Sequence, residues 1–142
     1  MIHCPLMDDC VFCKIAKHEI PSDIFYEDAD TVAFLDIKPT THGHSLVIPK
    51  KHFENIFDID EAALEATMRT AKKVAPAVRD AVGAKGLHMN SNNGEAAGQI
   101  VFHYHVHLIP RHDRSEFQFW GHHDLPKDEA KTLLEKLRAA LT

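Results

Sequence analysis

Three histidines alternate with other residues along one short run, at positions 103, 105 and 107. Successive side chains of a β-strand point to opposite faces, so these three rings would share one face. The residues between and beside them, from Phe102 to Leu108, are aromatic or apolar and would face a core. The run therefore predicts a strand over residues 100–109 that presents three titratable, nucleophilic or metal-binding imidazoles.

Three chemistries fit such a face. The rings could be solvent-exposed side chains without a role. They could bind a metal, but His103 and His107 would stand ~13 Å apart along a strand, whereas zinc needs nitrogens at ~2.1 Å. They could perform nucleophilic catalysis, because a neutral imidazole attacks phosphorus or an acyl carbon while neighbouring histidines bind oxygens or protonate a leaving group.

Two other segments carry candidate ligands. Residues 92–99, Asn-Asn-Gly-Glu-Ala-Ala-Gly-Gln, form a loop that is either a simple turn or a backbone that approaches phosphate or sugar. Cys10 and Cys13 form a CxxC pair with no strand predicted ahead of it, which disfavours a redox motif. A structural zinc would need two further ligands, for which His52 and His103 are candidates, and two thiols without metal are the alternative.

Composition limits the class of protein. The chain has 142 residues, 44% of them hydrophobic, and a formal net charge of −5, which fits one globular domain and argues against nucleic-acid binding. No apolar run approaches ~20 residues, so we expect no membrane span, and we do not expect residues 1–9 to be a signal peptide. Three cysteines favour a reducing cytoplasm over a disulfide scaffold.

The elements that must position these residues can be read from hydrophobic patterning. Short strands are predicted at 24–26, 31–36, 44–48 and, more weakly, 86–92, with a short helix or turn at 10–17. A long helix is predicted over about 60–82, capped by Asp58 or Asp60 and kinked at Pro76. Its apolar stripe is predicted to comprise Leu64, Met68, Ala71, Ala75, Val78 and Val82.

A last helix is predicted to open at Pro126, with Ala130, Leu133, Leu134, Leu137 and Leu141 on one side. The sum is an α+β fold in one domain, residues 1–142. Its core spans about 10–110, and 111–142 form a C-terminal extension. The sheet should be antiparallel with helices against one face and the histidines on the other.

The motif His103-Tyr104-His105-Val106-His107-Leu108-Ile109 resembles that of the histidine triad (HIT) superfamily, with Tyr104 in an apolar position. Asp36 in "AFLDI", the segment "GHSLVIPKKH" at 43–52 and "NNGEAAGQ" at 92–99 resemble family segments in order and spacing. The similarity covers roughly residues 10–110. The N-terminal CxFC is similar to that of a bacterial-type, zinc-containing branch close to the histidine triad nucleotide-binding (Hint) proteins.

This resemblance implies a five-stranded antiparallel sheet with a long central and a C-terminal helix. It also implies a homodimer whose subunits pair through the long helix and an edge strand into one continuous sheet. The implied activity is hydrolysis at the α-phosphate of a purine nucleoside phosphoramidate or related nucleotidyl conjugate. A nucleotidyl-histidine would form, and an AMP-like monophosphate would be released.

The resemblance also implies residue roles. His105 would be the nucleophile, His107 would bind α-phosphate oxygens and assist the leaving group, and His44 would complete the catalytic set. Asp36 would accept from ribose hydroxyls, Ile37 would lie beside the base, and Asn92 and Gln99 would contact phosphate or sugar. Cys10, Cys13, His52 and His103 would hold a structural Zn²⁺, so that His103 anchors the segment.

One position departs from the family pattern. Ile100 stands where related proteins often carry a phosphate-binding Ser or Thr, so only its backbone N–H could contribute there. The stretch 111–124, with Phe117, Phe119, Trp120, His122 and His123, could line a leaving-group pocket, pack on the core or join a dimer contact. The alternatives are a dinucleoside polyphosphate hydrolase, a nucleotide-binding or scaffold protein with incidental catalysis, and a zinc hydrolase.

Overall fold

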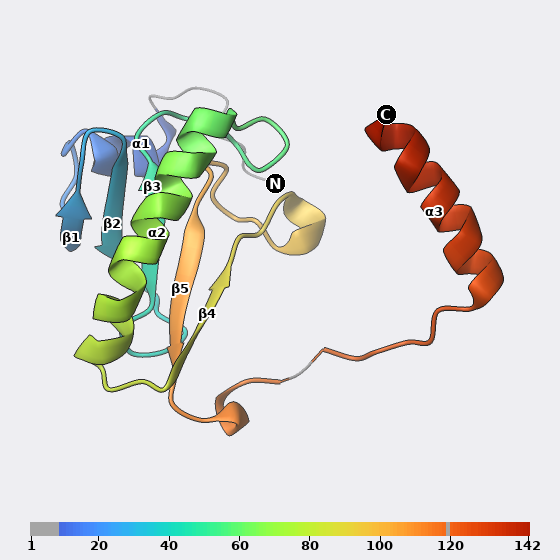
Figure 1. Ribbon diagram of the computed structural model, residues 1–142. Helices are drawn as coiled ribbons and strands as arrows, with labels where there is room; N and C mark the ends of the chain where they lie inside the picture. The colour runs from blue at the N-terminus through green and yellow to red at the C-terminus, as the bar shows by residue number, and fades with distance from the viewer. Residues whose placement is uncertain (1–8, 119) are drawn as a thin grey trace.

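The computed structural model describes residues 9–118 and 120–142, so Cys4 and Phe119 lie outside the described residues. In Figure 1 the long helix crosses the sheet, and the last helix stands at a distance from it. The strands are β1 (Ile24–Glu27), β2 (Thr31–Leu35), β3 (Ser45–Pro49), β4 (Gly86–Asn90) and β5 (Val106–Arg111). The helices are α1 (Val11–Ala16), α2 (Glu61–Ala81) and α3 (Lys127–Leu141), with short 3₁₀ turns η2 (Glu95–Ala97) and η3 (Arg114–Glu116).

The strands form one sheet in the order β1-β2-β3-β5-β4, and every neighbouring pair is antiparallel. The expected five-stranded antiparallel α+β fold is thus confirmed. The central strands β3 and β5 pair with Leu46 opposite His107. This register places Ser45, the residue after His44, opposite Leu108, the residue after His107, and so joins two of the expected site segments.

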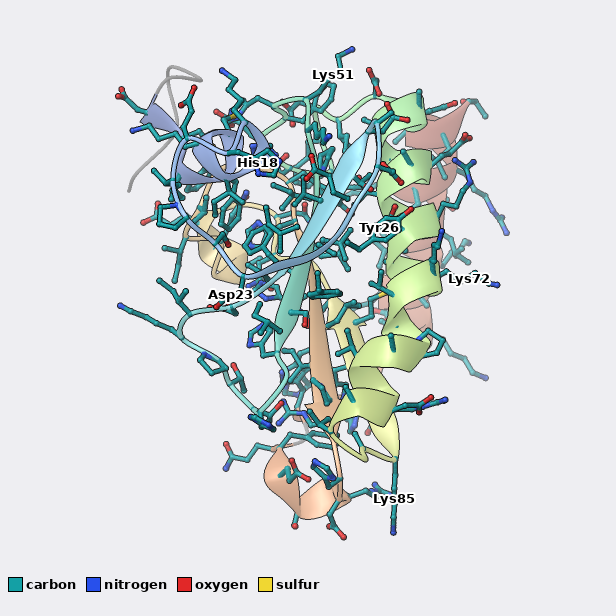
Figure 2. The ribbon with its side chains drawn as sticks, turned by 90° about the vertical axis from the view of Figure 1, so that its left-hand side faces the viewer. His18, Asp23, Tyr26, Lys51, Lys72 and Lys85 are labelled. Carbon is teal, nitrogen blue, oxygen red and sulfur yellow. The ribbon has the colours of Figure 1, made fainter. Side chains whose placement is uncertain are left out.

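Helices cover both faces of the sheet, contrary to the expectation of one helical face. α2 packs on one side, where its Ala71, Val74 and Val78 meet Val47 and Val106. On the other side, α1 packs against Val32, Phe34, Leu46 and Ile48. In Figure 2 the sheet is seen near its edge, with α1 and α2 on opposite sides. The prediction failed because the six-residue α1 is too short to show an apolar period.

The N-terminus of α2 is capped by Asp60, whose carboxylate accepts from the Ala63 N–H at 2.7 Å. Asp58 instead accepts from the backbone N–H groups of Glu54 and Asn55 in the preceding loop. The helix continues through Pro76 as one element, and the kink predicted there stays a prediction.

The buried stripe of α2 differs from the predicted one. Met68 lies on the exposed side, and Thr67, Thr70 and Val74 are buried with Ala71 and Val78. Hydrophobicity alone could not find the threonines, because their hydroxyls are satisfied inside the protein. Thr67 donates to the Ala63 carbonyl, and the Thr70 and Thr31 hydroxyls lie 2.7 Å apart.

The histidine strand begins later than predicted, at Val106. His103 and His105 lie in the irregular segment before it, which is held by a hydrogen bond from the Tyr104 N–H to the Phe53 carbonyl at 2.6 Å. This segment therefore pairs with the loop after β3 rather than with a strand. Phe102 and Tyr104 are nevertheless buried, as the alternation predicts.

The C-terminal helix forms where the sequence predicts it, over Lys127–Leu141 after Pro126. None of its residues is buried, and it stands away from the sheet (Figure 1). In the part of the chain that the structure describes, no helix has the length and apolarity needed to cross a bilayer.

Candidate active site and metal centre

His105 is buried at the junction of the irregular segment and β5, with its ring against the Phe12 ring of α1 at 5.1 Å. Its Nδ1 lies 2.7 Å from the His103 carbonyl oxygen. A carbonyl only accepts, so Nδ1 carries the ring proton and the lone pair is on Nε2. His105 is thereby fixed in the tautomer of a nucleophile or base.

A second pair of histidines lies beside it. The Thr40 N–H donates to Nδ1 of His44 at 3.0 Å, so a neutral His44 carries its proton on Nε2. That Nε2 lies 2.9 Å from Nδ1 of His107 and donates to it. His107 must then carry its own proton on Nε2, while its ring lies 4.9 Å from that of His105. One backbone N–H thus sets the tautomers of two rings.

Burial keeps these rings neutral. Desolvation lowers the pKa of His105 to about 4, although the hydrogen bond to the His103 carbonyl opposes the shift. Burial also lowers the pKa values of His44 and His107, partly offset by the carboxylate of Asp36. At pH 7 the cluster therefore offers a lone pair on His105 and an N–H on His107.

Asp36 follows β2 at the edge of this cluster. Its Oδ2 lies 3.6 Å from Nε2 of His44, and its Oδ1 accepts from the Lys38 N–H at 2.8 Å. The neighbouring Ile37 projects into solvent and is 84% exposed. An acceptor beside an open apolar side chain is an arrangement that suits a sugar and a base.

The loop residues expected to contact phosphate are placed differently from one another. Gln99 is buried, and its amide N–H groups donate to the carbonyls of Glu54 and Val101 while its oxygen accepts from the Gly94 N–H. Asn92 donates to the Gly98 carbonyl at 3.4 Å. The Ile100 side chain is 79% exposed. Gln99 therefore holds the loop in shape, with its amide engaged inside the protein.

Sulfur and nitrogen atoms converge at the expected metal centre. Nδ1 of His103 lies 3.4 Å from Sγ of both Cys10 and Cys13, and 3.2 Å from Nδ1 of His52, which is 3.3 Å from Sγ of Cys13. The edges of a tetrahedral zinc site with such ligands are roughly 3.4–3.8 Å. The four donor atoms are therefore close to the spacing that zinc requires.

Hydrogen bonds outside the cluster orient its ligands. Nε2 of His103 donates to the Pro49 carbonyl at 2.8 Å, which leaves the Nδ1 lone pair directed at the cysteines. Cys10 caps α1, and the Cys13 N–H donates to its sulfur at 3.4 Å, which fixes the position of the thiol. The donor set and its orientation thus fit Zn²⁺.

Asp36, His44 and His107 form a second group whose donor atoms lie within 4.8 Å of one another. Here the hydrogen bonds oppose metal binding, because Nδ1 of His44 accepts from Thr40 and its Nε2 carries the proton. A ligand nitrogen needs a free lone pair. This group is therefore a hydrogen-bonded chain of side chains.

One hollow lies mainly on the α2 side of the sheet. It measures about 520 Å³ and includes Phe25, Leu35, Val78 and Val82, touching the imidazole cluster only through Asp36 and His44. The histidines themselves face the α1 side, since His44 and His107 alternate with Ser45 and Val106. The hollow and the imidazole cluster are thus separate features.

The structure brings together the histidines and cysteines that sequence reasoning grouped, and it adds two residues that sequence reasoning missed. Phe12, between the cysteines, packs edge-on against the rings of both His103 and His105. Thr40 acts through its backbone N–H. Phe12 is visible within the CxFC pattern, whereas no sequence signal marks a backbone donor.

The chain is similar to several other proteins in sequence and in fold. The chain is 40% identical over 109 residues to adenylylsulfatase HINT3 of Arabidopsis thaliana, covering 77% of this chain and 55% of that protein. The crystal structure of SMU.412c from Streptococcus mutans UA159 superposes with a TM-score of 0.90 at 40% identity, covering 96% of this chain and 88% of that one.

A third relative is a Zn-bound histidine triad family protein from Mycobacterium smegmatis, with a TM-score of 0.74 and 34% identity over 96% of this chain and 97% of that one. A sequence model of the HIT domain matches residues 17–114, from the end of α1 to the first residue of η3. With this match across the sheet and the imidazole cluster, the chain belongs to the HIT domain family.

Proposed function

We propose that this protein is a nucleotide-binding hydrolase that cleaves at the α-phosphate of purine nucleoside phosphoramidates or related nucleotidyl conjugates. One observation carries the proposal: His105 keeps its proton on Nδ1, which leaves the lone pair on Nε2, and its ring lies 4.9 Å from that of His107. A named adenylylsulfatase among the relatives supports chemistry at a nucleotidyl phosphorus.

In the first step, Nε2 of His105 attacks the α-phosphorus, and the bond from phosphorus to the leaving group breaks. The leaving nitrogen or oxygen takes a proton from solvent water, while the Nε2–H of His107 hydrogen-bonds the phosphoryl oxygens and assists the departure without losing its proton. The Nδ1–H of His105 keeps its bond to the His103 carbonyl and so supports the positive charge on the phosphorylated ring. The product is a nucleotidyl-histidine.

In the second step, water attacks the same phosphorus and releases its proton to solvent. The bond to Nε2 of His105 breaks, and a nucleoside monophosphate leaves. His44 is a positioning residue, because its N–H to Nδ1 of His107 holds that ring in the tautomer that donates.

Asp36 would accept from the ribose hydroxyls, with Ile37 beside the base. Asn92 and the backbone at Ile100 would border the phosphate. For Gln99 the buried amide contacts support a role in shaping residues 94–101.

Cys10, Cys13, His52 and His103 would hold one structural Zn²⁺. The bound metal would tie α1 to the segment before β5 and would supply no group to the reaction. Reduced cysteines suit a cytoplasmic location.

We also propose a homodimer formed through α2 and the edge strand β4. Both carry exposed apolar side chains, Met68 on α2 and Met89 on β4. The free edge of β4 offers unpaired backbone groups for a second copy.

The proposal is tested by replacing His105 with alanine and assaying an adenosine phosphoramidate. Loss of the nucleophile should lower kcat/KM by at least 10³-fold, as for other covalent catalysts. His18→Asn is a matched control, since His18 is exposed and its φ of 59° is one that Asn tolerates. Rapid quenching of wild type should trap a nucleotide on His105.

Turnover of His105→Ala within tenfold of wild type would exclude the nucleophile. Tight nucleotide binding without turnover of phosphoramidates, adenylates or dinucleoside polyphosphates would favour a binding protein. A preference for dinucleoside polyphosphates would reassign the leaving group.

A further inference from the structure

The helix α3 has an apolar face that its own chain leaves exposed. Leu133, Leu134 and Leu137 are 46–51% exposed and Leu141 is 85% exposed, and none of the fifteen residues of α3 is buried. An isolated helix of this length is marginal in water, and its stability comes from packing an apolar stripe. The apolar stripe of α3 therefore needs a surface to pack against that is not the sheet of its own chain.

The separation of α3 recurs in a solved chain. The superposition on SMU.412c covers 96% of this chain with a TM-score of 0.90, so it includes α3 and the linker before it. Such a score over that coverage requires most of α3 to lie apart from the sheet in the same way. A helix held at one position without contacts to its own sheet needs a second molecule to hold it.

The protein described here also has an apolar hollow that its own α3 does not fill. Its apolar lining comprises Phe25 and Leu35, which are 42% and 41% exposed, Ala77, Val78 and Ala81 on the last turns of α2, and Val82 just after the helix. Phe25 lies on β1 and Leu35 on β2, at the sheet edge opposite β4. In Figure 1 α3 lies beyond β4, at the sheet edge opposite to the one where the hollow of its own chain lies.

A second copy that continues the sheet past β4 would present its hollow on the side where α3 lies. The far edge of five strands spaced ~4.8 Å apart is ~20 Å away. The linker between η3 and α3 spans residues 117–126, is irregular at the residues that the structure describes, and reaches ~33 Å when extended. The linker is therefore long enough to carry α3 across the partner's sheet.

We propose that α3 is an exchanged arm: the leucine face of each copy docks in the hollow beneath α2 of the other. The arrangement is reciprocal, as two-fold symmetry requires, because each copy gives one helix and receives one. It rests on the homodimer proposed above and adds the surfaces that hold it together.

The test measures mass against concentration, by light scattering after size exclusion, for the full-length protein. Leu133→Glu with Leu137→Glu should weaken dimerisation at least tenfold. The matched control is Thr132→Glu with Ala139→Glu, which adds the same charge on the opposite side of α3 and should leave the dimer intact. Ala77→Arg, in the hollow, should weaken the dimer as the leucine pair does.

Mixing the two defective proteins gives a discriminating outcome. A dimer with one copy of each has one intact helix facing one intact hollow, so mixing should restore part of the dimer. A wild type that is dimeric and insensitive to both variants would overturn the exchange but leave the homodimer. A wild type that is monomeric at all concentrations would remove both, and neither result depends on the phosphoramidase assay.

Discussion

At the scale of single residues, the histidines are distinguished by the partner of one ring nitrogen. The His103 carbonyl fixes the proton of His105, and the Thr40 N–H fixes that of His44 and, through it, that of His107. His103 itself donates to the Pro49 carbonyl and turns its other nitrogen to the cysteines. Three side chains of one type therefore have three different chemistries.

The His44–His107 pair makes a prediction about pH. Burial lowers both pKa values below the usual 6.5, so the pair stays neutral as the pH falls through that value. Protonation of His107 at lower pH removes the acceptor for the His44 N–H. The kcat/KM for a phosphoramidate should therefore be flat from about pH 8 to 6.5 and decline only below it. A kcat/KM that is already half-maximal at pH 7 or above would contradict the lowered pKa values of His44 and His107.

At the scale of elements, the site is assembled where loops meet the ends of β2, β3 and β5. The β3–β5 register places Leu46 opposite His107, which sets His44 beside the start of β5. α1 adds Phe12 and two sulfur ligands from the same face of the sheet. No single element holds a complete site, so the geometry depends on how these ends are fixed.

Gly43, immediately before His44, is one such fixing point. Its φ is +89°, and an added Cβ would lie 2.9 Å from Cγ1 of Val82 at the end of α2. Gly43→Ala should destabilise the protein by roughly 1–3 kcal/mol through backbone strain and the clash. Urea unfolding measures the loss. Gly86→Ala is the control, because its added Cβ meets nothing within 4 Å, and an equal loss in both variants would refute the argument.

At the scale of the whole molecule, the cysteine–histidine cluster joins the N-terminal helix, the loop after β3 and the segment before β5. Metal bound across such distant segments contributes directly to folding. α3 is the other long-range element, and in the proposed dimer its contacts would join two copies of the chain.

The cluster predicts about one zinc per chain by metal analysis. Cys13→Ser should lower the zinc content and the melting temperature, and a loss of about 2 kcal/mol corresponds to roughly 4–8 °C for a chain of this size. Cys4→Ser, a substitution at the remaining cysteine, should change neither. Full zinc content in Cys13→Ser would refute the ligand set, and a folded, inactive apo-protein reactivated by zinc would favour a catalytic metal.

The sequence by itself determined the elements and the residues that gather. Alternation and turn residues identified the strands, and the resemblance identified the cysteines and histidines that meet in space. These features are local or carried by residue type. The sequence could not show that the strand starts at Val106 or that threonines of α2 are buried, because both features depend on partners distant in the chain.

Only the tertiary structure decided what each histidine can do. The tautomers follow from backbone groups of Thr40, Pro49 and His103, and a backbone donor or acceptor has no signature in the sequence. The same holds for Gln99, whose amide type suggested phosphate binding but whose burial commits it to the loop. Side-chain type sets the available chemistry, and the surrounding hydrogen bonds select among its forms.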